Sequence, residues 1–383
     1  MKAIYLDHAA STPIHPQVAE RMLQVMTHTH GNASSVHAFG RSAKKVVSGA
    51  RDQIAKDLGC RPDELVFTAG GTESDNLALF GIAESLSHKG KHIITSQIEH
   101  HAVLHACEAL EQRGYEVTYL PVNAHGLVSI EEVEAAIRPD TILISIMFGN
   151  NEVGTIQPIT EIGQLARAKN IIFHTDAVQA LGAISLNCHE LPVDLISFSS
   201  HKINGPQGIG ALYIRHGVKV EPVLYGGLQE RKRRAGTENL AGIAGFAQAV
   251  ELAVQGLSER INHLESLRAY MLEELEQQVG TEGYVVNTPL DQSLPHILNI
   301  SFPGVKSETM LMNLDMENIA AASGSACTSG SLELSHVLQA MKIPENLLNS
   351  AIRFSFGMGN TREEIAYATQ KIATILKRIR SRN

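Results

Sequence analysis

The stretch Asp194-Leu-Ile-Ser-Phe-Ser-Ser-His-Lys202 carries a short apolar segment directly into a lysine. Residues 195–198 have the length and composition of a buried strand, and Lys202 follows the point where that strand would end. An apolar pocket disfavours the charged form of a lysine, so the neutral amine can attack a carbonyl and form a Schiff base. The stretch therefore predicts a buried strand followed by a candidate nucleophile. A solvated lysine at a strand end is the alternative.

Similar apolar segments recur on both sides of this stretch. Amphipathic segments such as 101–113 and 159–169 separate them, the second followed by Asn170 as a possible helix cap. Strands that alternate with helices indicate an α/β fold with a mostly parallel sheet flanked by helices. Ligands bind beyond the carboxyl ends of such strands, so the residues after each strand are the functional candidates. The expected strands lie at residues 64–68, 91–96, 141–148, 171–174, 195–198 and 210–214.

The length of 383 residues exceeds the size at which one hydrophobic core usually stops growing. Two long helical segments, 240–256 and 258–280, precede a C-terminal part with strands at 297–302 and 352–356 and a final helix from residue 361. We therefore expect a large domain at residues 15–260. Residues 1–14 and 261–383 would form a smaller α+β domain.

The composition excludes several classes of protein. A net charge of −8 argues against a nucleic-acid-binding surface, and no apolar run approaches the ~20 residues that span a bilayer. The four cysteines, Cys60, Cys107, Cys188 and Cys327, include no Cys-x-x-Cys pair, so neither a disulfide framework nor a thiolate metal site is indicated. A reducing cytoplasm fits this pattern.

A glycine pair follows the segment 64–68, in Thr68-Ala-Gly-Gly-Thr-Glu-Ser74. Exposed backbone N–H groups and the start of a helix allow this loop to hold a phosphate, although a plain strand-to-helix turn is the alternative. The loop lacks the Gly-Lys-Ser/Thr ending of a P-loop and is not Gly-x-Gly-x-x-Gly. A nucleotide enzyme is therefore disfavoured.

Polar residues also follow three other expected strands. Asp176 and Gln179 follow residues 171–174, and a carboxylate there could keep the ring nitrogen of pyridoxal 5′-phosphate (PLP) protonated. A helix N-cap is the alternative for Asp176. His100 follows the segment 91–96, and Asn151 follows 141–148. If these strands converge on Lys202, the four side chains would share one site.

A second chemical feature is Cys327, which lies among small residues in Ala321-Ala-Ser-Gly-Ser-Ala-Cys-Thr-Ser-Gly330. This setting indicates a reactive thiol, whereas a small buried hydrophobe is the alternative. A metal reading of His101 and His105, or of His174 and Asp176, lacks a His-Glu-x-x-His motif and a third ligand. We predict no metal site.

Taken in order, these motifs strongly resemble the cysteine desulfurases of the NifS/IscS type, which are class V, fold-type I PLP enzymes. The resemblance runs nearly end to end, and the cysteine segment is of the long-loop, group I form. The motifs that carry it include Tyr5-Leu-Asp-His-Ala-Ala-Ser-Thr-Pro13, Gly71-Thr-Glu-Ser-Asp-Asn76, Arg234-Ala-Gly-Thr237 and Ser323-Gly-Ser-Ala-Cys-Thr328.

The resemblance implies a role for each matching residue. Lys202 would bind PLP covalently, His100 would stack on its ring and move protons, and Cys327 would accept sulfur. Asp176 would pair with the ring nitrogen, and Gln179 and Asn151 with the ring 3-oxygen. The phosphate would be bound by Gly71, Thr72, Ser199 and His201, with Thr237 of the second subunit of a homodimer. Asn151 and Arg353 would bind the substrate, Arg353 its carboxylate.

The implied reaction converts L-cysteine to L-alanine and leaves a persulfide on Cys327. A tRNA 2-thiouridylase is the expected sulfur acceptor ahead of an iron-sulfur scaffold, because residues 226–239 and 99–105 resemble the short desulfurases of tRNA thiolation and the chain stops after its final helix. Direct nucleic-acid binding is not expected. The alternatives are a selenocysteine lyase or another class V PLP enzyme, and a non-enzymatic sulfur-relay protein that uses Cys327 alone.

Overall fold

The computed structural model describes residues 3–323 and 334–381. Its central feature is a seven-stranded sheet in the order β2-β8-β7-β6-β5-β3-β4. The pairs from β7 through β4 are parallel, whereas β8 runs antiparallel to both β2 and β7. The predicted α/β fold with a mostly parallel sheet is therefore confirmed. The strands are β2 (Leu65–Thr68), β3 (His92–Ser96), β4 (Glu116–Leu120), β5 (Thr141–Ser145), β6 (Ile172–Asp176), β7 (Leu195–Ser199) and β8 (Gly210–Ile214).

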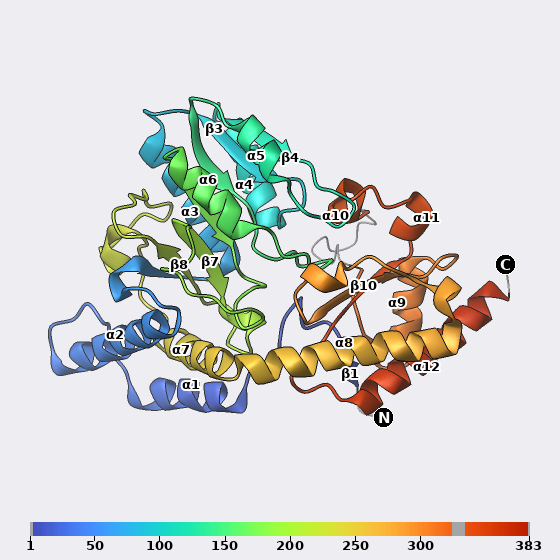
Figure 1. Cartoon of the computed structure of the whole chain (residues 1–383). Coiled ribbons are helices and arrows are strands. Elements are labelled where there is room, and N and C mark those ends of the chain that lie inside the picture. The colour runs from blue at the N-terminus through green and yellow to red at the C-terminus, as the bar shows by residue number, and fades with distance from the viewer. Residues whose placement is uncertain (1–2, 324–333, 382–383) are drawn as a thin grey trace.

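Helices cover this sheet and extend from it (Figure 1). Helix α3 packs across β5 to β8, and α1 and α2 both pack against α7. Asn170, at φ 56°, directly follows the last turn of α6 and ends it in the left-handed conformation that asparagine tolerates. The helices of this part are α1 (Pro16–His28), α2 (Ala38–Asp57), α3 (Gly71–Leu86), α4 (His101–Glu111), α5 (Ile130–Ala136), α6 (Ile159–Ala168) and α7 (Leu240–Gln255).

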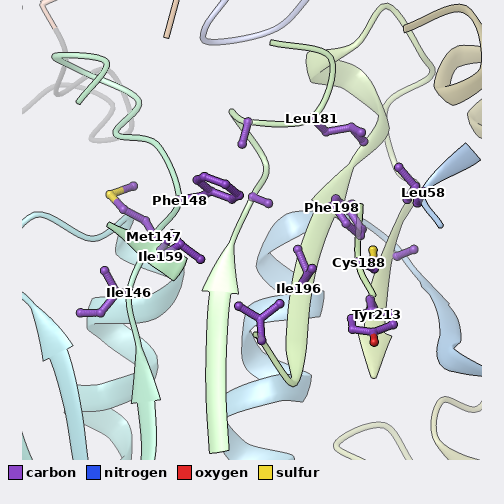
Figure 2. Close-up of a cluster of buried hydrophobic side chains, with 14 of the residues drawn as sticks. Leu58, Ile146, Met147, Phe148, Ile159, Leu181, Cys188, Ile196, Phe198 and Tyr213 are labelled. Carbon is purple, nitrogen blue, oxygen red and sulfur yellow. The ribbon is translucent and has the colours of Figure 1, made fainter. Parts of the chain in front are cut away.

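The largest hydrophobic cluster lies beside the strands that lead to Lys202. Figure 2 shows Ile196 and Phe198 of β7 next to Tyr213 of β8, with Cys188 and Leu58 beside them. Strand β7 is buried along its whole length, because helices cover both faces of a parallel sheet. The strand end that carries the lysine is thus supported by packed side chains.

The C-terminal part has its own sheets and its own core. Strands β9 (Val285–Val286), β10 (Ile297–Ser301) and β12 (Ala351–Ser355) form an antiparallel sheet, and β1 (Ile4–Tyr5) pairs in parallel with β11 (Ile319–Ala320). A separate cluster joins Ile4 and Leu6 to side chains between Leu264 and Leu376. This cluster supports the division at residues 14 and 261, which we retain as a proposal.

Helix α8 (Leu257–Val279) connects the two parts along one side of the molecule and packs against α12 (Arg362–Arg380) (Figure 1). The other helices there are α9 (Ser307–Met316), α10 (His336–Ala340) and α11 (Glu345–Leu348). Within residues 3–323 and 334–381, no single helix has the length and apolar character to cross a membrane. Helices α7 and α8 taken together would meet that criterion, but a bend of 73° separates them.

Two strands of the large sheet differ most from the expected ones. Strand β4 was not expected, because it is a partly exposed edge strand in which Glu116 and Thr118 interrupt the apolar pattern. Strand β5 ends at Ser145 and not at 148. The N–H groups of Ile146 and Phe148 nevertheless still donate to carbonyls of β6, which holds the segment leading to Asn151 beside that strand.

Candidate active site

A cavity of about 280 Å³ lies at the carboxyl ends of β5, β6 and β7, beside the start of α3. Residues from the N-terminal segment and from β12 close it on the other side. The position agrees with the rule that ligands bind beyond the carboxyl ends of parallel strands. The predicted site residues that line this cavity are Gly71, Thr72, His100, Asn151, Asp176, Gln179, Ser199, His201, Lys202 and Arg353.

Lys202 ends a short 3₁₀ turn, Ser200–Lys202, that directly follows β7. Its Nζ donates to the carbonyl oxygens of Ala9 and Ala10, at 2.6 and 2.7 Å. The N-terminal segment therefore orients the amine toward the cavity. The predicted nucleophile and the first residues of the chain meet here, although 192 positions separate Lys202 from Ala10.

Asp176 is the last residue of β6 and is buried. Its Oδ1 accepts a hydrogen bond from the Val178 N–H at 2.8 Å, and the chain after it forms turns, so the helix N-cap alternative does not apply. Burial raises the pKa of Asp176 to about 6, while the Lys202 cation acts in the opposite direction. A cationic ring nitrogen would satisfy this carboxylate, which is the chemistry that a PLP site supplies.

The first turn of α3, where the sequence predicts phosphate binding, forms one end of the cavity. Gly70 has φ 151°, and a Cβ on Gly71 would lie 2.7 Å from Val178 Cγ2, so both positions favour glycine. Thr72, Ser199 and His201 line both this cavity and a wider hollow outside it. The N–H groups at a helix start together with side-chain hydroxyls fit an anionic phosphate.

The carboxylate in this turn, that of Glu73, has its charge compensated by neighbouring donors. Glu73 Oε1 accepts from Arg234 Nε at 2.7 Å, and its Oε2 accepts from the Ala69 N–H at 2.9 Å. Burial, reinforced by the Lys202 cation, lowers the pKa of His201 to about 4, so that imidazole is neutral and can donate one hydrogen bond. The residues present therefore fit the phosphate group of PLP.

His100 is the N-cap of α4, where its Nδ1 accepts from the Ala102 N–H at 3.1 Å. Burial, reinforced by the Lys202 cation, lowers the pKa of His100 to about 4. With Nδ1 occupied as an acceptor, the proton of the neutral ring resides on Nε2. The buried side chain of the preceding residue, Glu99, accepts bonds from Ser96 Oγ and the Met147 N–H and so holds this loop against β5.

Arg353 of β12 brings a buried guanidinium into the cavity. Its Nη1 donates to the Asn151 carbonyl at 2.9 Å, and its Nη2 donates to Asp7 Oδ1 at 2.8 Å. Its Nε has no hydrogen-bond partner among residues 3–323 and 334–381. A planar guanidinium with a donor still to satisfy suits a carboxylate ligand.

Three polar residues of this region were not expected from the sequence. Asp7 pairs with Arg353, His296 Nε2 lies 3.1 Å from Gln179 Oε1, and Asp75 lines the cavity beside Asp176. Gln179 Nε2 also donates to the Ala9 carbonyl, so that side chain is fixed from both ends. Asp7 and Asp75 lie inside the resembling motifs, which was the available signal, whereas no sequence pattern marked His296.

The last two predicted site residues are Thr237 and Cys327. Thr237 is exposed and does not line the cavity, and Cys327 lies outside the described residues. His101 and His105, considered above as metal ligands, have stacked rings 5.0 Å apart. In the described part of the chain, no three His, Cys, Asp or Glu side chains are arranged to hold a metal ion.

The sheet, the lysine after β7, the carboxylate after β6 and the phosphate-binding start of α3 define a PLP-dependent enzyme of fold type I. The Aminotransferase class-V model matches residues 4–367. The chain is 47% identical to the cysteine desulfurase IscS of Dictyoglomus turgidum, over 99% of this chain and 96% of that protein. It is 49% identical to the putative cysteine desulfurase IscS 1 of Bacillus subtilis, over 99% and 100%.

A solved structure described as a NifS-like protein superposes with a TM-score of 0.92 at 39% identity, covering 98% of this chain and all of the other. The chain therefore belongs to the class-V aminotransferase family, and within it to the PLP-dependent cysteine desulfurases.

Proposed function

We propose that the enzyme converts L-cysteine to L-alanine and transfers the sulfur to the thiolate of Cys327. The substrate C–S bond breaks and an S–S bond forms on Cys327. The electron pair of the broken bond stays with the substrate carbon, which takes up a proton, so no external oxidant or reductant is needed. The observation that carries this proposal is the meeting of Lys202, Asp176 and Arg353 in one cavity.

The cofactor would be held at three points. Lys202 would bind it covalently, Asp176 would face its ring nitrogen, and the start of α3 with Thr72 and Ser199 would bind its phosphate. When bound, PLP withdraws electron density from the substrate carbon next to the amine. Gln179, held by Ala9 and His296, would present its amide to the ring 3-oxygen together with Asn151.

We propose that Arg353 orients the substrate. Its guanidinium, held by the Asn151 carbonyl, would bind the L-cysteine carboxylate and exchange part of its contact with Asp7 for the ligand. The neutral His100 imidazole can accept a proton without first losing one, which suits a group that moves protons near the substrate thiol. Proton transfer by His100 and sulfur capture by Cys327 are thus separate tasks.

We further propose a homodimer with shared sites. Thr237 is exposed and lies outside the cavity of its own chain, as expected for a residue that completes the phosphate site of a second copy. The nearby segment also exposes Val223, Leu224, Tyr225 and Leu228. An apolar surface of this kind beside a site residue supports contact between copies.

For the sulfur acceptor, we propose a tRNA 2-thiouridylase ahead of an iron-sulfur scaffold. The support is the resemblance of residues 226–239 and 99–105 to desulfurases of tRNA thiolation. A competition in which both acceptors are offered to the enzyme carrying labelled persulfide tests this order. Faster transfer to the scaffold would reverse it.

The reaction itself is tested by measuring alanine and sulfide from L-cysteine in the presence of a thiol reductant. Equal amounts of the two products are expected, and both should vanish in Cys327→Ser. A selenocysteine lyase would instead release alanine from L-selenocysteine after loss of Cys327. A sulfur-relay protein would produce no alanine from L-cysteine.

A further inference from the structure

The cavity contains a second buried carboxyl group that the proposed reaction does not use. Asp75 lies in α3, one turn after the phosphate-binding residues, and is 1% exposed. It lines the same cavity as Asp176. Its Oδ1 has no hydrogen-bond partner among the residues that the structure describes. Burying an ionised carboxyl group is costly when one of its oxygens has no hydrogen-bond partner.

The groups around Asp75 form a polar layer across three neighbouring strands. His174 Nε2 of β6 lies 3.6 Å from Asp75 Oδ1 and 3.0 Å from Ser197 Oγ of β7. His174 Nδ1 lies 2.8 Å from Ser145 Oγ of β5. All of these side chains are buried, because α3 covers the strands at this point. Asp176 follows His174 by two residues on β6, so the layer lies directly behind Asp176.

The charges in this layer can be assigned from the surroundings. Burial lowers the pKa of His174 to about 3, so the imidazole is neutral. Burial raises the pKa of Asp75 well above its ordinary range, and Asp176 and Glu99 add to the increase while Ser197 opposes it. Asp176 has the Lys202 cation and the Val178 N–H to stabilise its charge. Two carboxyls in one buried pocket oppose each other's ionisation, so these surroundings favour the proton on Asp75.

We propose that Asp75 is a positioning residue that carries a proton, and that with His174, Ser145 and Ser197 it forms an uncharged layer behind Asp176. Asp176 is thereby left ionised toward the cofactor ring nitrogen. An ionised Asp75 would share that nitrogen's charge and weaken the orientation. The inference rests on the assignment of Asp176 to the ring nitrogen in the proposed function.

The protonation of Asp75 is tested by infrared spectroscopy of the holoenzyme. The difference spectrum of wild type minus Asp75→Asn should contain the C=O stretch of a protonated carboxylic acid. Glu73→Gln is the matched control, since Glu73 lies in the same helix and is ion-paired with Arg234. The control should show loss of a carboxylate band only. A carboxylate band lost in Asp75→Asn would overturn the proposal.

The positioning role is tested by the protonation of the bound cofactor. With ¹⁵N-labelled PLP, the ring nitrogen should stay protonated in Asp75→Asn, and the pH midpoint of the visible absorbance should match wild type. Removal of an ionised carboxylate would instead move that midpoint by on the order of one pH unit. A shift of that size would contradict an uncharged Asp75.

Asp75→Leu tests whether the polar contacts of residue 75 matter in addition to its lack of charge. Leucine leaves Ser197 and His174 without their carboxyl neighbour, so the Kd for PLP should rise about tenfold or more. Asparagine should instead keep an affinity near that of the wild type. Equal affinities for PLP in the two variants would overturn the positioning role. If the leucine variant does not fold, the infrared and ¹⁵N results for Asp75→Asn decide the question. Asp176→Asn should deprotonate the ring nitrogen. An unchanged ¹⁵N signal there would refute the site assignment itself.

Discussion

Arg353 Nη2 donates to Asp7 Oδ1 at 2.8 Å, joining residues 346 positions apart in the chain. The guanidinium is 3% exposed, and its second anchor is the Asn151 carbonyl. Asp7 follows β1, which pairs with β11, so the N-terminal strand delivers a counter-ion to the arginine of the C-terminal part. The fold itself therefore holds in place the guanidinium that we propose binds the substrate carboxylate.

Arg353→Lys is expected to raise the KM for L-cysteine by about tenfold or more with a smaller change in kcat. A lysine ammonium cannot keep the bonds to Asp7 and Asn151 and also bind a carboxylate in the bidentate manner of arginine. Steady-state kinetics measure the effect. Arg268→Lys, a buried arginine that bonds Ser293 and Leu294 away from the cavity, is the control and should leave KM unchanged. A loss of kcat alone would contradict the assignment.

Lys202→Ala is expected to remove the covalent link to PLP while the protein stays folded. The side chain lies in a cavity and contacts two backbone carbonyls, so its removal leaves the packed core of β7 intact. Mass spectrometry after borohydride reduction should find PLP on Lys202 in wild type and no adduct in the variant. A reducible adduct on another lysine would refute the role of Lys202.

Cys327→Ser is expected to retain PLP and to bind L-cysteine, yet to lose alanine production, because a hydroxyl cannot accept sulfur. Cys60→Ser is the matched control, since Cys60 packs against the main core and does not line the cavity. Alanine yield and the mass of a persulfide adduct are the two measurements. Wild-type alanine production by Cys327→Ser would assign sulfur abstraction to another group.

Mixed dimers test the shared site. Thr237→Asp should repel the phosphate and inactivate its homodimer, and Lys202→Ala should inactivate the other. Heterodimers of the two would contain one doubly damaged site and one intact site. After mixing and reversible dissociation, each heterodimer should therefore have up to half of the wild-type activity. Inactive mixtures, with heterodimers verified by mass, would show that Thr237 acts within its own chain.

Acid should destabilise the fold through His174. Its pKa falls from an ordinary 6.5 to about 3 because it is buried, so between these values the unfolded chain binds a proton that the folded chain does not. The stabilisation is fully present above pH 6.5 and is lost as the pH falls toward 3. Urea unfolding of wild type should lose about 1.4 kcal/mol per pH unit more than His174→Gln in that window. Parallel pH profiles would show that another group binds this proton.

The strands that carry the site were predictable because each contains a short, mainly apolar segment, as a sheet covered on both faces requires. The expected β8 coincides with the observed strand, and β7 differs by one residue. Edge strand β4 was not predictable from the same signal, because a half-exposed strand needs no such run. Helix ends followed local chemistry, as at Thr361, whose side chain caps the first turn of α12.

By itself, the sequence determined the types of group available: a lysine, an aspartate and a glycine pair, each following a buried strand. Only the tertiary structure decided that Asp7 meets Arg353, that His296 lies against Gln179 and that Asp75 lies beside Asp176. These contacts join segments 101 to 346 residues apart, and no local periodicity encodes such pairings. The charge of a buried group likewise depends on the neighbours that folding brings to it, so the protonation of this site is a property of the folded chain.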